Sequence, residues 1–122
     1  MIERKCSCEM GMHRAPLERY IIESGAVNRL PELLRDYNKV YMVCDENTYR
    51  VLGERAEQIL ESVGKFSHKH VLKGDVLPDA RNIGDVLIHL NDPKADSDIF
   101  KYSSQPDFIL AVGSGVVNDI CR

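Results

Sequence analysis

The residues best suited to chemistry stand near the end of the sequence, in the run DFILAVGSGVVNDICR. Phe108–Val112 is unbroken and apolar, which predicts a strand covered on both faces, and a helix can start at Val116. Gly113, Ser114 and Gly115 then form a strand-to-helix turn, where free backbone N–H groups and the helix dipole favour an anion such as phosphate. Because tight turns of this kind need glycine for packing alone, the motif leaves two interpretations open, a phosphate site and a simple turn.

The other residue with chemical potential is Asp45, which follows the apolar run from Lys39 to Cys44. An aspartate at the end of a strand can accept hydrogen bonds from both hydroxyls of an adenosine ribose and repels a 2′-phosphate, which favours NAD over NADP. The competing interpretation is a helix N-cap, because Asn47 and Thr48 are also cap-type residues. The common dinucleotide fingerprint places the glycine loop first and the acidic residue about 20 residues later. Here the order is reversed, so a simple Rossmann assignment fails.

The chain resembles the N-terminal nucleotide-binding domain of the glycerol-1-phosphate dehydrogenases in four segments, CSC, IIESGAVNRLPELL, VYMVCDENTY and ILAVGSGVVNDICR. These enzymes stand in the superfamily of iron-containing alcohol dehydrogenases, glycerol dehydrogenases and dehydroquinate synthases, which places the acidic residue before the glycine loop. The resemblance implies that Asp45 binds the adenosine ribose of NAD, with NADP as the alternative. It also implies that seven residues wrap the pyrophosphate and approach the nicotinamide: Gly113, Ser114, Gly115, Val116, Val117, Asn118 and Asp119.

The family interconverts dihydroxyacetone phosphate and glycerol 1-phosphate by metal-assisted hydride transfer. Its divalent metal, zinc, nickel or iron, is held by an aspartate and two histidines in a helical C-terminal domain that these 122 residues lack. We therefore expect this chain to be the cofactor-binding half, inactive alone, with no catalytic or metal residue, and the full-length enzyme to be a homo-oligomer. The sequence stops at Arg122 inside a predicted helix, and we expect this end to be a proteolytic cut or an engineered boundary rather than a natural domain end. Glycerol dehydrogenase and iron-type alcohol dehydrogenase remain alternatives.

The elements that must position these residues alternate along the chain. Residues 1–15 show no period and are expected to be irregular, and 91–105 is polar and expected to be a loop with one helical turn at 96–102. Four strands and four helices follow from the apolar patterns, with strands at 17–23, 39–44, 66–72 and 108–112. The first helix is predicted at 27–37, and the last can start at 116–120. The second and third helices follow from two apolar stripes, one of Leu52, Ala56, Ile59, Leu60 and Val63 and the other of Ile83, Val86, Leu87 and Leu90. This order predicts an α/β, Rossmann-like nucleotide-binding domain over 1–122, with a parallel sheet of about four or more strands and helices on both faces.

Composition sets the class of protein. A chain of 122 residues, 43% hydrophobic and 29% charged, fits one globular domain. No apolar run approaches the roughly 18 residues of a membrane span, and the N-terminus lacks a signal-peptide core, so we expect a cytoplasmic protein. A net charge of −3 gives no electrostatic footprint for nucleic acid or an anionic membrane. The expected partner is therefore a small-molecule substrate.

The cysteines divide into two groups. Cys44 and Cys121 fall in apolar patterns and are interpreted as small buried hydrophobes. Cys6, Cys8 and His13 could offer three soft ligands to zinc. A structural zinc site uses four ligands, usually with C-x-x-C spacing, and no fourth candidate stands nearby, so an unliganded segment is the favoured interpretation.

The remaining histidines are also weighed as metal ligands. In the alternating strand 66–72, Phe66, His68, His70 and Leu72 are expected to share one face. No carboxylate stands at a fixed position beside the two histidines in the sequence. His89 falls off the apolar stripe of its helix and is expected to be a solvated surface residue. None of them is assigned a site.

A different class of function is a stand-alone, flavodoxin-like binding or signalling module, with Asp45 as a phosphoacceptor. Such receiver modules add acidic residues after the first strand and a lysine after the last. Here Ser24 and Gly25 follow the expected first strand, and no lysine follows Phe108. The missing chemistry disfavours this alternative.

Overall fold

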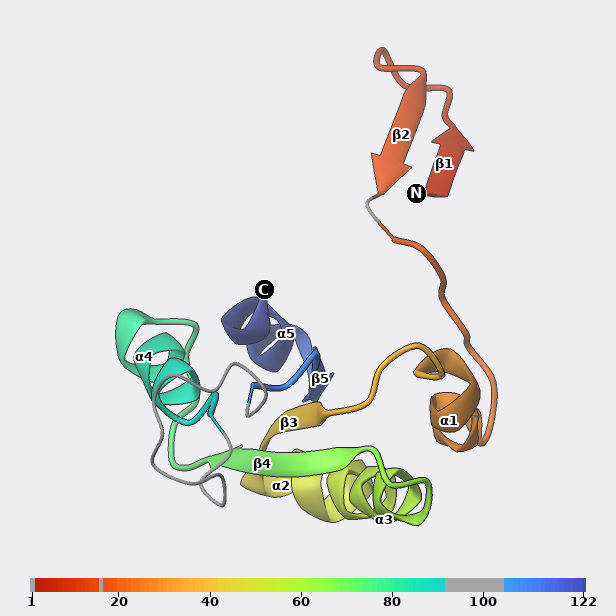
Figure 1. The fold of residues 1–122 in the computed structure, drawn as a ribbon. Helices are drawn as coiled ribbons and strands as arrows, with labels where there is room; N and C mark the ends of the chain where they lie inside the picture. Colours follow the sequence, from red (N-terminus) through yellow and green to blue (C-terminus); the bar gives the residue numbers. More distant parts are fainter. Residues whose placement is uncertain (1, 16, 92–104) are drawn as a thin grey trace.

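The computed structural model describes residues 2–15, 17–91 and 105–122 (Figure 1). In this part of the chain, no helix has the length and apolar character that a membrane span requires. The helical turn expected at 96–102 lies outside the described residues.

The centre of the fold is a parallel sheet of three strands in the described residues, with the order β4-β3-β5. The strands are β3 (Val40–Asp45), β4 (Phe66–Leu72) and β5 (Phe108–Val112). The side chains of β3 from Val40 to Cys44 are all 0% exposed, as expected for a central strand with helices over both faces. The parallel α/β class with helices on both faces is confirmed, but the described sheet has three strands rather than four or more.

The strand predicted at 17–23 is wrong. This segment has no strand or helix assignment, and Tyr20 and Ile22 are 68% and 91% exposed. The run of Tyr20, Ile21 and Ile22 has strand propensity, but propensity becomes a strand only where a neighbouring strand and a buried face are supplied. The segment instead crosses from the N-terminal hairpin to the first helix (Figure 1).

The N-terminal residues form a hairpin rather than the predicted irregular segment. Strands β1 (Ile2–Lys5) and β2 (Met12–Ala15) pair antiparallel, with Lys5 opposite Met12. Gly11 has a positive φ of 66°, which its missing Cβ permits, and it lets the chain reverse. Figure 1 shows the hairpin standing away from the sheet.

One face of the sheet is covered by the elements before and after β3. The predicted helix 27–37 is present but shorter and partly 3₁₀, and the predicted helix after Asp45 contains a π-helical turn. The elements are η1 (Ala26–Arg29), α1 (Leu30–Leu33), α2 (Glu46–Thr48), η2 (Tyr49–Gly53) and α3 (Glu54–Ser62).

The π turn changes which side chains reach the core. Ala56, Ile59 and Leu60 are buried as the helical stripe predicts, but Leu52 and Val63 are 40% and 43% exposed. Leu52 lies in η2, where the wider turn breaks the 3.6-residue phase, and Val63 lies just past the end of α3. The stripe is therefore confirmed only within α3.

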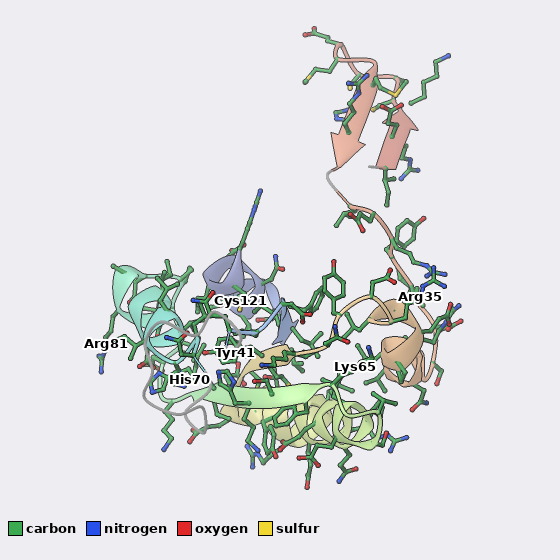
Figure 2. All side chains as sticks on the ribbon, viewed as in Figure 1. Arg35, Tyr41, Lys65, His70, Arg81 and Cys121 are labelled. Carbon is green, nitrogen blue, oxygen red and sulfur yellow. The ribbon has the colours of Figure 1, made fainter. Side chains whose placement is uncertain are left out.

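The opposite face is covered by α4 (Ala80–Ile88) and α5 (Gly115–Cys121). Tyr41 and Val43 of β3 pack there with Val86 of α4. The hydroxyl of Tyr41 donates a 3.0 Å hydrogen bond to the Val86 carbonyl, which satisfies the one polar atom of this buried side chain. Figure 2 shows Tyr41 among the side chains on this side of the sheet.

A β-bulge alters the face assignment of β4. Val40 pairs with Phe66 but Tyr41 pairs with His68, so one extra residue, Ser67, is inserted at this point. Phe66 therefore packs with Val40 on the α3 face, whereas His68, His70 and Leu72 face α4. The prediction that Phe66 shares a face with His68 is wrong because the strict period of two breaks at the bulge.

The two cysteines expected in the core are both packed. Cys44 is 0% exposed, and Cys121 is half-buried against the cluster around Tyr41. Burial raises the pKa of the Cys44 thiol to about 11. Cys44 is therefore a small apolar side chain at neutral pH, as predicted.

Asp107 joins the starts of β5 and β3. Its two carboxylate oxygens accept hydrogen bonds from the backbone N–H groups of Asn38 and Lys39, both at 2.8 Å. Desolvation opposes the effect, but these backbone donors hold the pKa of Asp107 below its usual value of 3.8. The charged form is therefore favoured in the folded state.

This pKa shift predicts an acid-sensitive contribution to stability. A carboxylate with a lowered folded pKa stabilises the fold above its unfolded pKa and loses that contribution as the pH falls below 3.8. We expect Asp107→Asn to lower the free energy of unfolding by about 1 kcal/mol at pH 7, and the difference from the parent to shrink between about pH 4 and pH 2. Urea unfolding at each pH measures it. Asp36→Asn, at an exposed position, serves as the charge control. An equal loss of unfolding free energy in that variant would contradict the role of the Asp107 hydrogen bonds.

Candidate functional site

The carboxyl ends of β3 and β5 lie side by side, and both sequence-predicted features stand there. Cys44 and Val112 are register partners, so the residues that follow them, Asp45 and Gly113, are neighbours across the two strands. The chain continues from β3 to β4 on one side, while β5 pairs on the other side, so the strand order reverses at this point. Open parallel sheets bind ligands in the crevice outside such a switch point.

Asp45 is the N-cap of the helix that follows β3. Its Oδ1 accepts a 2.8 Å hydrogen bond from the Thr48 backbone N–H, and the Thr48 Oγ1 accepts one from the Asp45 N–H at 3.0 Å. The N-cap interpretation is therefore confirmed. Within the described residues, the second carboxylate oxygen has no hydrogen-bond partner, and the side chain is half-buried. One oxygen therefore caps the helix, and the other is left for a ligand.

The two glycines of the turn have different environments. A Cβ on Gly113 would lie 2.6 Å from Cγ2 of Val117, so this glycine is required by packing between the turn and α5. A Cβ on Gly115 would meet no heavy atom within 4 Å. Ser114 occupies the N-cap position of α5, and its side chain makes no capping hydrogen bond. Gly115 and Ser114 therefore present open backbone and a free hydroxyl at the helix start.

The next residues of the predicted site divide between core and surface. Val117 is 0% exposed, and Val116 packs against the same core cluster. Asn118 and Asp119 are exposed. Val117 is therefore a core residue, whereas the two polar residues can offer their side chains to a ligand.

A cavity of about 370 Å³ opens beside the turn, on the face of the sheet covered by α1 and α3. Apolar side chains from Val27, Leu30, Leu52 and Val112 line it, and Arg19 stands among them. A mostly apolar hollow with one cation next to an anion-type turn can hold a planar base together with a phosphate. Arg19, Tyr20 and Ile21 also line this cavity. The sequence did not assign them to a site, because residues 17–23 were predicted to form a strand of the sheet.

The sequence of the chain is similar to those of a known group of enzymes. The chain is 30% identical to a glycerol-1-phosphate dehydrogenase [NAD(P)+] of Bacillus subtilis over 112 residues, which is 87% of this chain and 25% of that protein. The chain is similar to the glycerol-1-phosphate dehydrogenases. The predicted resemblance is therefore confirmed.

Two further relatives of these dehydrogenases and synthases match. A glycerol-1-phosphate dehydrogenase [NAD(P)+] of Halalkalibacterium halodurans is 28% identical over 123 residues, covering 94% of this chain and 28% of that protein. A 3-dehydroquinate synthase of Staphylococcus carnosus is 28% identical over 99 residues, covering 81% and 26%. The chain spans about a quarter of the length of these relatives. Neither a family model nor a solved structure matches it.

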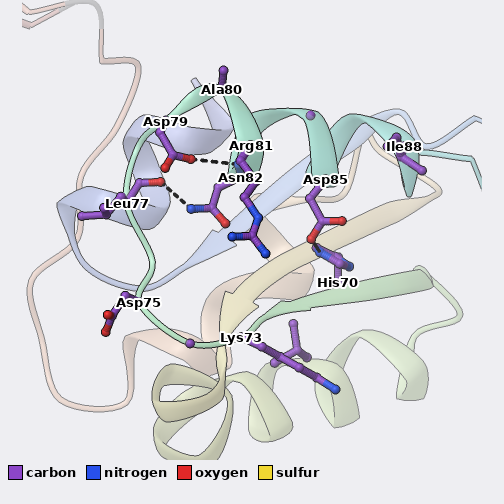
Figure 3. Close-up of a pocket in the computed structure, with 13 residues that line it drawn as sticks. His70, Lys73, Asp75, Leu77, Asp79, Ala80, Arg81, Asn82, Asp85 and Ile88 are labelled. Carbon is purple, nitrogen blue, oxygen red and sulfur yellow. Dashed lines mark hydrogen bonds and ion pairs between the residues drawn. The ribbon is translucent and has the colours of Figure 1, made fainter.

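A second hollow, of about 940 Å³, lies between the end of β4 and α4 in this relative of the glycerol-1-phosphate dehydrogenases (Figure 3). Asp79 caps α4 by accepting a 3.0 Å hydrogen bond from the Asn82 N–H, and the Asn82 side chain donates to the Leu77 carbonyl at 2.7 Å. Arg81 and Lys73 line the same hollow. These contacts fix the loop that leads from β4 into α4.

The histidines make a cluster that the sequence analysis missed. The Nε2 of His70 lies 2.7 Å from Oδ2 of Asp85, and the His70 ring stacks on that of His89 with centroids 4.3 Å apart. His68 stacks on Tyr41, and its Nε2 lies 2.7 Å from the His89 carbonyl oxygen. His89 is exposed as expected, but Asp85 supplies the carboxylate thought to be absent. The i, i+4 spacing of Asp85 and His89 was the signal.

Proposed function

We propose that residues 1–122 are the N-terminal, cofactor-binding domain of an NAD(P)-dependent, metal-dependent dehydrogenase that interconverts dihydroxyacetone phosphate and glycerol 1-phosphate. The observation that carries the proposal is the adjacency of Asp45 and the Gly113 turn at the switch point of the sheet. The names of the Bacillus subtilis and Halalkalibacterium halodurans relatives support the reaction class. A Rossmann-like cofactor domain has its ligand at this position in the fold.

Different residues of the site are proposed to bind different parts of the cofactor. The carboxylate oxygen of Asp45 that makes no capping bond accepts hydrogen bonds from the adenosine ribose. The Oδ1 atom keeps its bond to the Thr48 N–H. The pyrophosphate lies against the open backbone at Gly115 and the hydroxyl of Ser114, where no Cβ blocks its approach. Asn118 and Asp119 extend from the exposed side of α5 toward the nicotinamide end. NAD is preferred over NADP because a 2′-phosphate would meet the charge of Asp45.

The chain supplies orientation, and the bound nicotinamide supplies the hydride. The zinc, nickel or iron ligands of the whole enzyme are proposed to stand outside these residues. The cluster of His70, Asp85 and His89 does not fit that role, because the Nε2 of His70 is bonded to Asp85 and the Nδ1 of His89 is bonded to the Asp85 carbonyl oxygen. The whole enzyme is proposed to be a homo-oligomer, which exposed apolar residues such as Ile22 and Ile88 support.

An Asp45→Asn variant tests the cofactor site. Asparagine is as good an N-cap as aspartate, so the fold is expected to keep its stability, while the lost charge weakens the bonds to the ribose hydroxyls. A hydrogen bond to a charged group contributes about 1.5–3 kcal/mol, so we expect NADH to bind at least about tenfold more weakly. Titration followed by NMR chemical-shift changes measures it, because this method detects weak binding.

Asp36→Asn is the matched control, with the same change of charge in the segment that enters β3, at the opposite edge of the sheet. It is expected to leave NADH binding unchanged. The proposal fails if Asp45→Asn binds NADH as the parent does, or if the shifts map away from Asp45 and the Gly113 turn. Turnover of a triose phosphate by the 122-residue chain would contradict the need for a further domain.

A further inference from the structure

The hairpin of β1 and β2 lacks the usual sources of stability. Ile2 is half-buried, and the side chains of residues 3–14 are exposed. The exposed fractions of Met10 and Met12 are 78% and 43%. A two-stranded hairpin without a packed face is marginal in water, and small elements of this kind are commonly held by a disulfide or a metal. Some further interaction must therefore hold the hairpin.

The hairpin turn gathers three soft ligands. One ligand atom each from Cys6, Cys8 and His13 lies within 4.8 Å of the others. The closest pair is Sγ of Cys8 and Nε2 of His13, at 2.9 Å. The turn itself is fixed by the Cys6 N–H, which donates to the Gly11 carbonyl at 2.8 Å, and by the Gly11 N–H, which donates to the Cys8 carbonyl at 2.9 Å.

We propose that Cys6, Cys8 and His13 form a zinc site at the tip of the hairpin, with water as the fourth ligand. Zinc accepts two thiolates and one imidazole with water in the fourth tetrahedral position, so the missing fourth protein ligand does not exclude the metal. It needs sulfur–sulfur and sulfur–nitrogen separations of about 3.8 and 3.6 Å, given bonds of about 2.3 Å to sulfur and 2.0–2.1 Å to nitrogen. The Cys8–His13 pair has to open by about 0.7 Å, a small rotation of exposed side chains.

Zinc binding at the tip is coupled to proton release and joins the two strands. Binding releases one proton from each cysteine to the solvent as the two zinc–sulfur bonds form, while His13 binds through a neutral nitrogen. Both strands of the hairpin are then joined at the tip, since Cys6 follows β1 and His13 lies in β2.

The site differs from the other donor cluster of the described residues. His70, Asp85 and His89 also lie within 4.8 Å of one another, but their nitrogen and oxygen atoms already bond to each other or to helix α4. In the hairpin, by contrast, solvent reaches all three donors. Zinc would take the place of the hydrogen bond between Cys8 and His13 there.

Zinc binding to the reduced, metal-free 122-residue chain tests the proposal. We expect one zinc per chain by elemental analysis, and a thiolate-to-metal absorption band when cobalt replaces zinc. Losing even an outer-shell partner of a ligand costs about 10- to 100-fold in affinity, so Cys6→Ser, Cys8→Ser and His13→Gln should each weaken zinc binding at least about 100-fold in chelator competition. Zinc should also slow amide exchange in residues 2–15.

Two variants serve as controls. Ser7→Ala changes the residue between the two cysteines without removing a ligand, and Cys121→Ala removes a thiol outside the hairpin. Both should bind zinc as the parent does. The proposal is overturned if the Cys6→Ser, Cys8→Ser double variant retains the bound zinc. It is also overturned if the reduced chain takes up no zinc.

Discussion

The Gly113→Ala variant is expected to lose about 1–3 kcal/mol of unfolding free energy. The new Cβ would stand 2.6 Å from Cγ2 and 2.8 Å from Cβ of Val117, closer than nonbonded carbons approach. Val117 is 0% exposed and packs in the cluster of Tyr41, Leu72 and Val86, so it cannot retreat without disturbing that core. Urea unfolding followed by circular dichroism measures the loss.

Gly115→Ala is the control for this change, because its Cβ would enter open space. We expect its unfolding free energy to stay within about 0.5 kcal/mol of the parent. Its NADH binding should nevertheless weaken, since the new methyl group stands where the pyrophosphate approaches. Equal stability of the Gly113→Ala and Gly115→Ala chains would contradict the packing role of Gly113.

Truncating Leu60 to alanine is expected to have the largest effect on stability, a loss of about 2–5 kcal/mol. Leu60 is 0% exposed and packs with Leu34 and Val40, which join α3, the end of α1 and the start of β3. Its removal leaves a cavity where three elements meet, and the surrounding helices can fill it only by moving. Urea unfolding at pH 7 gives the value.

The comparison for Leu60 is Leu87→Ala on α4. Leu87 is 62% exposed although the sequence pattern places it on the apolar stripe of its helix. Its truncation should change the unfolding free energy by no more than about 0.5 kcal/mol. A loss below about 1 kcal/mol for Leu60→Ala would mean that the cluster of Leu34, Val40 and Leu60 is not a continuous core.

The site edge could be predicted because it follows from parallel pairing alone. Once Phe108–Val112 and the run before Asp45 are read as parallel strands, their carboxyl ends must share one edge of the sheet. Their direct adjacency, through the pairing of Cys44 with Val112, also needed the strand order β4-β3-β5. No local pattern specifies that order.

The wrong predictions concern segments whose structure depends on contacts that the local sequence does not specify. Ile21 and Ile22 read as a strand, yet no edge of the sheet receives them, and Ile22 is 91% exposed. The hairpin was missed for the opposite reason, since its strands carry charges rather than an apolar face and its turn lacks the Asn-Gly or Asp-Gly signal. The bulge after Phe66 shifts the strand by one residue, and a period of two cannot anticipate it.

The two pairings of β3, with β4 and with β5, also bear on the order in which the sheet forms. Val40 pairs with Phe66 on one side and with Phe108 on the other, so the second pairing closes a loop more than twice as long as the first. The extra loop-closure entropy is on the order of 1 kcal/mol, which favours forming β3 with β4 before β5 joins. We therefore expect Asp45 and the Gly113 turn to meet only when β5 joins the sheet. A ligand that bridges them would bind the completed sheet and not the pair of β3 and β4 alone.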